Sequence, residues 1–66
     1  MKLILNGVEY EYRGDETLAD LLREVGADPN QVAVLVNDEV IAASLRATMR
    51  LTEGSRVELL TLAAGG

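Results

Sequence analysis

The stretch "LILNGVEYEYRGDETLADLLREVG", residues 3–26, decides the fold, because it joins a β-hairpin directly to an amphipathic helix. Asn6-Gly7 separates two short apolar runs, and this dipeptide favours the tight hairpin turn whose two central residues have positive φ. In the second run, residues 8–12, apolar and charged side chains alternate, which predicts one buried face and one face in water. The apolar members of this run are Val8, Tyr10 and Tyr12. We therefore expect the chain to begin with an antiparallel hairpin.

An amphipathic helix is predicted over residues 17–26, because apolar side chains recur there at the spacing of one helical face. These side chains are Leu18, Leu21, Leu22 and Val25. Thr17 stands at the expected N-cap, and Gly26 stands where a left-handed residue would end the helix. Four neighbouring acids are assigned to the solvated side, since no base partner accompanies them; a catalytic carboxylate pair is the alternative. They are Asp15, Glu16, Asp20 and Glu24.

The remaining sequence predicts three more strands. Residues 32–36, "VAVLV", are rich in β-branched valine and short enough to form a strand buried at the centre of a sheet. A tight turn at "NDE" leads to a brief strand at 40–41. Residues 42–50 are expected to form a crossing loop with one helical turn, in which Met49 fills a gap in the core. After the turn "LTEGS", residues 56–62 form the last strand.

The order of these elements predicts the fold class. A helix that follows a hairpin must bury its leucines on the sheet, which gives a two-layer α+β domain. If the last strand returns through the middle of the sheet beside the first, the architecture is the ubiquitin-like β-grasp, a mixed sheet packed on one amphipathic helix. We expect residues 1–62 to form this domain and residues 63–66 to form a flexible C-terminal tail ending in Gly-Gly.

Composition excludes several classes of function. The 66 residues contain no cysteine and no histidine, which removes disulfides, soft metal ligands and the commonest general base. A self-sufficient enzyme or a metal site is therefore not expected. Eleven acids against six cations give a net charge of −5, which disfavours nucleic acid. No apolar run is long enough for a membrane span or a secretory signal, so we expect a cytoplasmic protein that is a monomer by itself.

The chain end, "TLAAGG", raises a separate question, because Gly65 and Gly66 add no side chain after a leucine-rich strand. Such an end can be a frayed terminus or a cloning scar. Together with "VAVLVNDEVI" and "LTEGSRVELL", it resembles the thiamine-biosynthesis sulfur carrier family (ThiS), which is similar to the small subunit of molybdopterin synthase. The resemblance covers the whole chain. Ser55 and Ala42-Ala43 depart from the family pattern, which places Asp after the glycine and often carries a Pro-Arg pair.

The resemblance implies a carrier rather than an enzyme. In the family, an adenylating (ThiF-like) enzyme uses ATP to activate the C-terminal carboxylate, which is that of Gly66 here, and the acyl-adenylate is converted to a thiocarboxylate. The sulfur comes from a donor such as a cysteine desulfurase and is used by a thiazole synthase (ThiG-like). ATP and Mg belong to the partner, so no cofactor is expected on this chain. Ala63, Ala64 and Gly65 are slim enough to thread into that partner.

A docking face is also predicted. Alternation puts Leu35 and Leu60 on the sheet face away from the helix, on strands that we expect to be neighbours. Exposed apolar side chains grouped in this way mark a partner site, and scattered surface leucines are the alternative. Two other functions stay open: a sulfur carrier for molybdopterin or tRNA thiolation, and a ubiquitin-like modifier or interaction module joined through Gly66 to target lysines.

Overall fold

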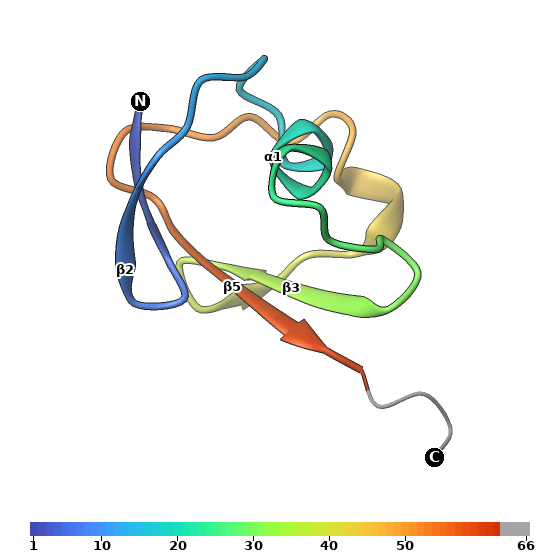
Figure 1. Cartoon of the computed structure of the whole chain (residues 1–66). Helices are drawn as coiled ribbons and strands as arrows, with labels where there is room; N and C mark the ends of the chain where they lie inside the picture. Colours follow the sequence, from blue (N-terminus) through green and yellow to red (C-terminus); the bar gives the residue numbers. More distant parts are fainter. Residues whose placement is uncertain (63–66) are drawn as a thin grey trace.

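In the computed structural model, which describes residues 1–62, five strands form one sheet and a helix covers one of its faces (Figure 1). In chain order, the elements are β1 Lys2–Leu5, β2 Val8–Glu11, α1 Leu18–Glu24, β3 Val32–Val36, β4 Glu39–Val40, the 3₁₀ helix η1 Ala43–Leu45 and β5 Arg56–Thr61. The predicted flexible tail, 63–66, lies outside the described residues.

The sheet has the strand order β2-β1-β5-β3-β4, so the last strand returns through its middle. β5 runs parallel to β1 and antiparallel to β3, and the other pairs are antiparallel. The first turn forms as predicted, with φ of 50° at Asn6 and 82° at Gly7. A mixed sheet of this order packed on a helix is the ubiquitin-like β-grasp, which confirms the predicted α+β class.

The hydrophobic core lies between α1 and the sheet. Its buried members are Leu3, Tyr12, Leu18, Leu21, Leu22, Val32, Val34, Val36, Ile41, Leu51 and Val57. Val25, Met49 and Leu59 are partly buried and pack against this cluster. The predicted core faces of α1, β3 and β5 are therefore confirmed, and so is the gap-filling position of Met49.

Local caps set the ends of α1. The Thr17 hydroxyl oxygen accepts a hydrogen bond from the Asp20 N–H at 3.2 Å, which satisfies one free donor of the first turn. At the other end, Gly26 has a φ of 75° and donates its N–H to the Arg23 carbonyl. A left-handed glycine at this place closes the helix without the steric cost of a Cβ.

Two predicted details of the hairpin and the brief strand were wrong. Val8 was placed on the buried face, yet it is 67% exposed, because it directly follows the hairpin turn, at the end of the hairpin far from α1 (Figure 1). The brief strand is Glu39–Val40 rather than residues 40–41. Ile41 is buried instead, and its N–H donates to the Val34 carbonyl at 2.9 Å. The brief strand therefore begins and ends one residue earlier than expected.

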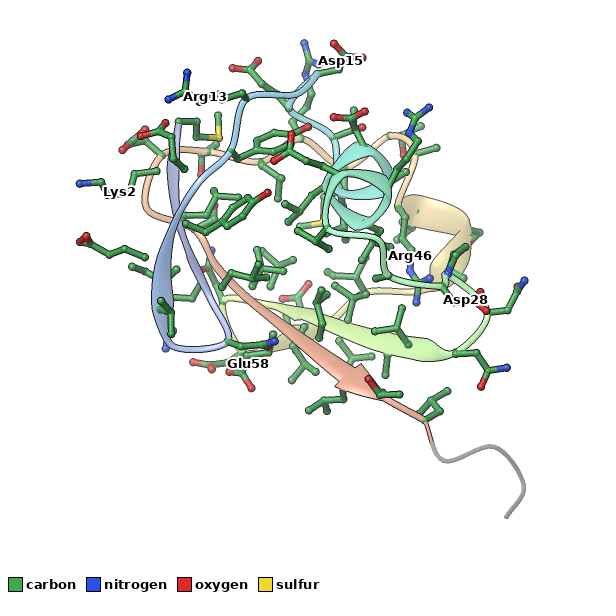
Figure 2. The ribbon with its side chains drawn as sticks, in the orientation of Figure 1. Lys2, Arg13, Asp15, Asp28, Arg46 and Glu58 are labelled. Carbon is green, nitrogen blue, oxygen red and sulfur yellow. The ribbon has the colours of Figure 1, made fainter. Side chains whose placement is uncertain are left out.

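Arg46, which the sequence pattern did not single out, is 8% exposed. Its guanidinium donates to the carbonyls of Pro29 and Val32, each at 2.9 Å. Figure 2 shows the side chain between the end of η1 and the chain that enters β3. Arg46 thus fastens the crossing loop to the segment between α1 and the sheet, and satisfies two carbonyls there.

Candidate docking face and carrier end

The end of the described chain is held by the central strand β5. Leu62, the last described residue, donates its N–H to the Gln31 carbonyl at 2.7 Å. Leu59 donates its N–H to the Asn6 side-chain oxygen at 2.8 Å. The sheet therefore fixes the position of the chain as far as Leu62. The predicted site residues Ala63, Ala64, Gly65 and Gly66 lie outside the described residues, and their roles stay predictions.

The two leucines predicted to dock a partner lie where the alternation put them. Leu35 is opposite Glu58, and Leu60 is opposite Ala33, so the two leucines are diagonal neighbours on adjacent strands. They occupy the face that α1 does not cover, where Leu60 is 51% exposed and Leu35 is half-buried. Figure 2 shows Glu58 of the same face pointing away from α1. Their placement is confirmed, and their docking role stays a prediction.

Sequence reasoning missed two further members of this face. Val40 pairs directly with Leu35 across the β3–β4 hairpin and is 72% exposed. Leu62 lies two residues after Leu60, on the same side of the chain, and is 50% exposed. We call Leu35, Val40, Leu60 and Leu62 the outer patch. Pairing residues across the two-residue turn would have found Val40, and alternation along the last strand would have found Leu62.

Charged side chains border the outer patch. Arg56 and Asp38 form an ion pair with a nitrogen–oxygen distance of 2.7 Å, and both are exposed. Lys2 and Glu9 lie 3.9 Å apart farther along the sheet. Exposed pairs of this kind contribute little to stability, but an apolar centre with a charged rim is the usual composition of a protein interface.

The strongest ionisable cluster is on the other side of the sheet, between β2 and α1. The Tyr12 hydroxyl donates to the Asp20 carboxylate at 2.6 Å and accepts from the Glu16 N–H at 2.8 Å. Burial, followed by the hydrogen bond to Asp20, raises the pKa of Tyr12 to about 12. Hydrogen bonds from Tyr12 and from the Asp15 N–H lower the pKa of Asp20. Asp20 is therefore not the solvated acid expected, but the acceptor that fastens β2 to α1.

The other pKa shifts come from contacts along β2. The hydrogen bond that Tyr10 donates to the Glu24 carboxylate raises the pKa of Tyr10. The N-terminal ammonium of Met1 donates to Glu11 at 2.9 Å and lowers the pKa of Glu11. These groups are paired with each other at the edge of the sheet, away from the outer patch. Their arrangement serves the fold, since each is bonded to another part of the domain and none belongs to the outer patch.

The described residues offer neither a metal-binding cluster nor a helix that could cross a membrane. Residues 1–62 contain no group of three or more acidic, histidine or cysteine side chains that could hold a metal ion. No helix in the same part of the chain has the length and apolar character needed to cross a membrane. The features that remain are the central strand β5, which leads to Leu62, and the outer patch beside it.

These features define a ubiquitin-like β-grasp protein. The profile of the ThiS family matches residues 3–66, and the chain belongs to this family. The crystal structure of a thiamine biosynthesis protein (ThiS) from Geobacter metallireducens superposes with a TM-score of 0.85 at 29% identity, with all of both chains covered. A solution structure of a thiamine biosynthesis protein from the same organism gives a TM-score of 0.80 at 29% identity, covering all of this chain and 88% of the other.

A curated relative is much longer than this chain. The chain is 35% identical over 66 residues to a thiazole synthase from Paramagnetospirillum magneticum. This match covers 100% of this chain but 20% of that protein, so the chain spans about a fifth of the length of the curated relative. The family resemblance seen in the sequence is thereby confirmed.

Proposed function

We propose that this chain is a sulfur carrier of thiamine biosynthesis and that the carboxylate of Gly66 carries the sulfur. The observation that carries the proposal is the family match, which runs through Gly65-Gly66. The fold supports it, because the central strand β5 leads to the last described residue, Leu62, shortly before these glycines. The chain then acts as a co-substrate of partner enzymes, which agrees with its lack of histidine and cysteine.

The proposed chemistry has two steps at Gly66. A terminal carboxylate has a pKa of roughly 3.5, so it is ionised at neutral pH and its oxygen can attack the α-phosphorus of ATP. Pyrophosphate leaves and an acyl-adenylate forms. Sulfur at the oxidation level of sulfide then adds to the acyl carbonyl, and AMP leaves with the former carboxylate oxygen, which gives the thiocarboxylate. ATP and Mg would be bound by the adenylating (ThiF-like) partner. A cysteine desulfurase would supply the sulfur as a persulfide, and a dithiol reductant would release it at the sulfide level while being oxidised to a disulfide.

The small residues before Gly66 suit this role. Ala63, Ala64 and Gly65 have one side-chain carbon or none, so they can pass through a narrow channel toward a buried nucleotide. At Gly65 the missing Cβ also lets the backbone approach the partner closely. The threading role follows from the size of these side chains and from the proposed chemistry.

Thiazole synthase is the proposed acceptor of the sulfur. This chain matches about a fifth of a relative that bears that name. A carrier-like segment within such a protein supports a direct transfer between the two, because joining them in one chain raises their effective concentration. In this proposal the sulfur is transferred from the Gly66 thiocarboxylate into the thiazole ring.

The outer patch is the proposed docking site for the adenylating enzyme. Leu60→Asp should leave the domain folded, because the side chain is half exposed, and should weaken binding of the enzyme. Val8→Asp is the matched control, because Val8 is also exposed but lies on β2, at the other end of the sheet order. Calorimetric titration of both variants measures the effect. Equal affinity for the two variants would remove the patch from the docking site.

Reconstitution tests the proposed function. The chain is mixed with the adenylating enzyme, ATP, Mg, a cysteine desulfurase, cysteine and a dithiol reductant, and the product is divided among three acceptors. We expect sulfur transfer to the thiazole synthase reaction and none to a molybdopterin precursor or to tRNA. Transfer to one of the latter would redirect the carrier to another pathway. Covalent adducts between Gly66 and protein lysines would identify a modifier instead.

A further inference from the structure

The central strand β5 is longer than its parallel neighbour. Within the described residues it pairs with β1 at Arg56 and Val57 alone, because β1 ends at Leu5 and the chain then turns into β2. The second half of β5 runs past this turn (Figure 1). On this side the sheet has a gap beside residues 59–61, which we call the β5 notch.

Backbone groups in the notch point toward the missing neighbour. The Val57 carbonyl accepts from the Asn6 N–H at 2.9 Å, and the Leu59 N–H donates to the Asn6 side chain at 2.8 Å. Successive residues of a strand point their backbone groups to opposite sides, so Thr61 faces the same way as Val57 and Leu59. No residue among 1–62 bonds the Thr61 N–H or the carbonyls of Leu59 and Thr61. The backbone N–H and carbonyl of Leu60 point toward β3 instead.

A hollow adjoins the notch on the helix side. Its volume is about 400 Å³, and Leu59 and Thr61 form part of its wall. Of the described residues that line it, Asp28 is the only charged one. On the opposite side of the strand lie Leu60 and Leu62 of the outer patch. A strand added at the notch would therefore place an apolar side chain in the hollow, and its neighbours in sequence would lie beside the outer patch.

The notch differs from the two outer edges of the sheet. The edge strand β2 carries Glu9 and Glu11, and the edge strand β4 is two residues long, beside Asp38 and with Glu39 in it. Charges and short length are the devices by which proteins prevent pairing at a sheet edge. Residues 59–62 have neither charge nor proline. The chain thus protects both outer edges and leaves the notch open to pairing.

We propose that the β5 notch accepts an extended backbone segment of the adenylating enzyme, added to the sheet beside β5. This inference rests on the proposed function. Residues 63–66 span at most about 14 Å when fully extended, so an enzyme that holds the Gly66 carbonyl must lie against the end of β5. Backbone pairing is the contact that the free N–H and C=O groups of the notch can make. It sets the direction in which the chain end enters the active site.

Thr61→Pro tests the proposal, because proline has no backbone N–H. The substitution removes the donor that faces the notch and leaves the hydrogen bonds between β3 and β5 in place. Thr61→Val is the matched control, since it keeps the N–H and the shape of the side chain. In ATP–pyrophosphate exchange by the adenylating enzyme, Thr61→Pro should raise KM for the carrier by about 3- to 10-fold, the effect of one lost hydrogen bond, with kcat unchanged. Thr61→Val should match the wild type. Equal KM in all three proteins would overturn the notch proposal.

Amide hydrogen exchange of the wild-type chain gives a second readout that needs no variant. The Thr61 N–H should exchange fast in the free protein, whereas the Leu60 N–H, which faces β3, should be protected. Addition of the adenylating enzyme should protect Thr61. A fast Thr61 amide in the complex would contradict strand addition. If the wild type is active in ATP–pyrophosphate exchange but its Thr61 amide stays unprotected in the complex, the notch proposal alone fails. If the wild type shows no ATP–pyrophosphate exchange, the proposed function fails.

Discussion

The side chains on the two faces of the sheet differ in how far the fold buries them. On the helix side, Leu22 of α1 is 2% exposed, and Tyr12 and Asp20 satisfy each other through a hydrogen bond of 2.6 Å. On the outer side, Leu60 is 51% exposed and Val40 is 72% exposed. The helix side therefore carries the stability of the domain, and the outer side is free for partners. Substitutions on the two faces should separate stability from function.

The largest expected effect is functional and lies at the chain end. Gly65→Val should reduce ATP–pyrophosphate exchange by more than about 100-fold, because a branched Cβ displaces the reacting carbonyl in a positioned site. The free energy of unfolding should change by no more than about 0.5 kcal/mol. Ala64→Gly is the control, and it should retain exchange because it adds no bulk. Undiminished exchange in Gly65→Val would contradict terminal carboxylate chemistry.

A pair of leucine substitutions compares the two faces directly. Leu22→Ala removes a buried side chain and should lower the free energy of unfolding by about 2–5 kcal/mol. Leu60→Ala removes an exposed one and should change it by about 0.5 kcal/mol or less. Urea denaturation followed by circular dichroism measures both. Similar losses at the two positions would mean that the outer patch is part of the stabilising core.

Gly14 tests the polar cluster on the helix side. A Cβ at this position would lie 1.8 Å from an Asp20 carboxylate oxygen and 2.6 Å from the Tyr12 hydroxyl. Gly14→Ala should therefore lower the free energy of unfolding by about 1–3 kcal/mol, as overpacking does. If the clash with Asp20 is the cause, Gly14→Ala should be milder in an Asp20→Ala background. Additive losses in this double-mutant cycle would point to another cause.

The smallest expected effect is the pH dependence of stability. The pKa of Asp20 is lowered in the folded state, so its contribution is present above the unfolded value and is lost as the pH falls through the folded value. The pKa of Tyr12 is raised to about 12, so its contribution is lost as the pH rises from about 10 toward that value. Thermal unfolding against pH should show a weaker acid slope in Asp20→Asn and a weaker alkaline slope in Tyr12→Phe. Unchanged slopes in both would remove the cluster from the stabilising interactions.

The features that the sequence predicted correctly are those encoded by near neighbours. Asn6-Gly7 specifies its own hairpin turn, and Gly26 ends the helix with its own positive φ. The leucine spacing of α1 and the alternation of β3 and β5 were enough to assign their core faces, and with them the positions of Leu35 and Leu60. These patterns do not depend on the rest of the fold.

The features that were missed depend on distant parts of the chain. Asp20 accepts a hydrogen bond on the helix side of the sheet because the fold brings the Tyr12 hydroxyl to it. Arg46 donates to carbonyls that lie 14 and 17 residues away in the sequence. Val8 is exposed because the hairpin extends beyond α1. The β5 notch exists because β1 ends before β5 does. The lengths of the elements and the register between strands determine such features, and the alternation of side chains within one strand does not reveal them.

The mass of the protein isolated from its own cells tests the central claim most directly, that Gly66 is the site of sulfur transfer. Intact-mass analysis followed by fragmentation reads the state of the chain end without any assumption about partners. We predict a fraction of molecules in which one oxygen of the Gly66 carboxylate is replaced by sulfur, and this fraction should rise when the sulfur acceptor is depleted. A chain that continues past Gly66, or one whose Gly66 is joined to protein lysines and never bears sulfur, would contradict the account.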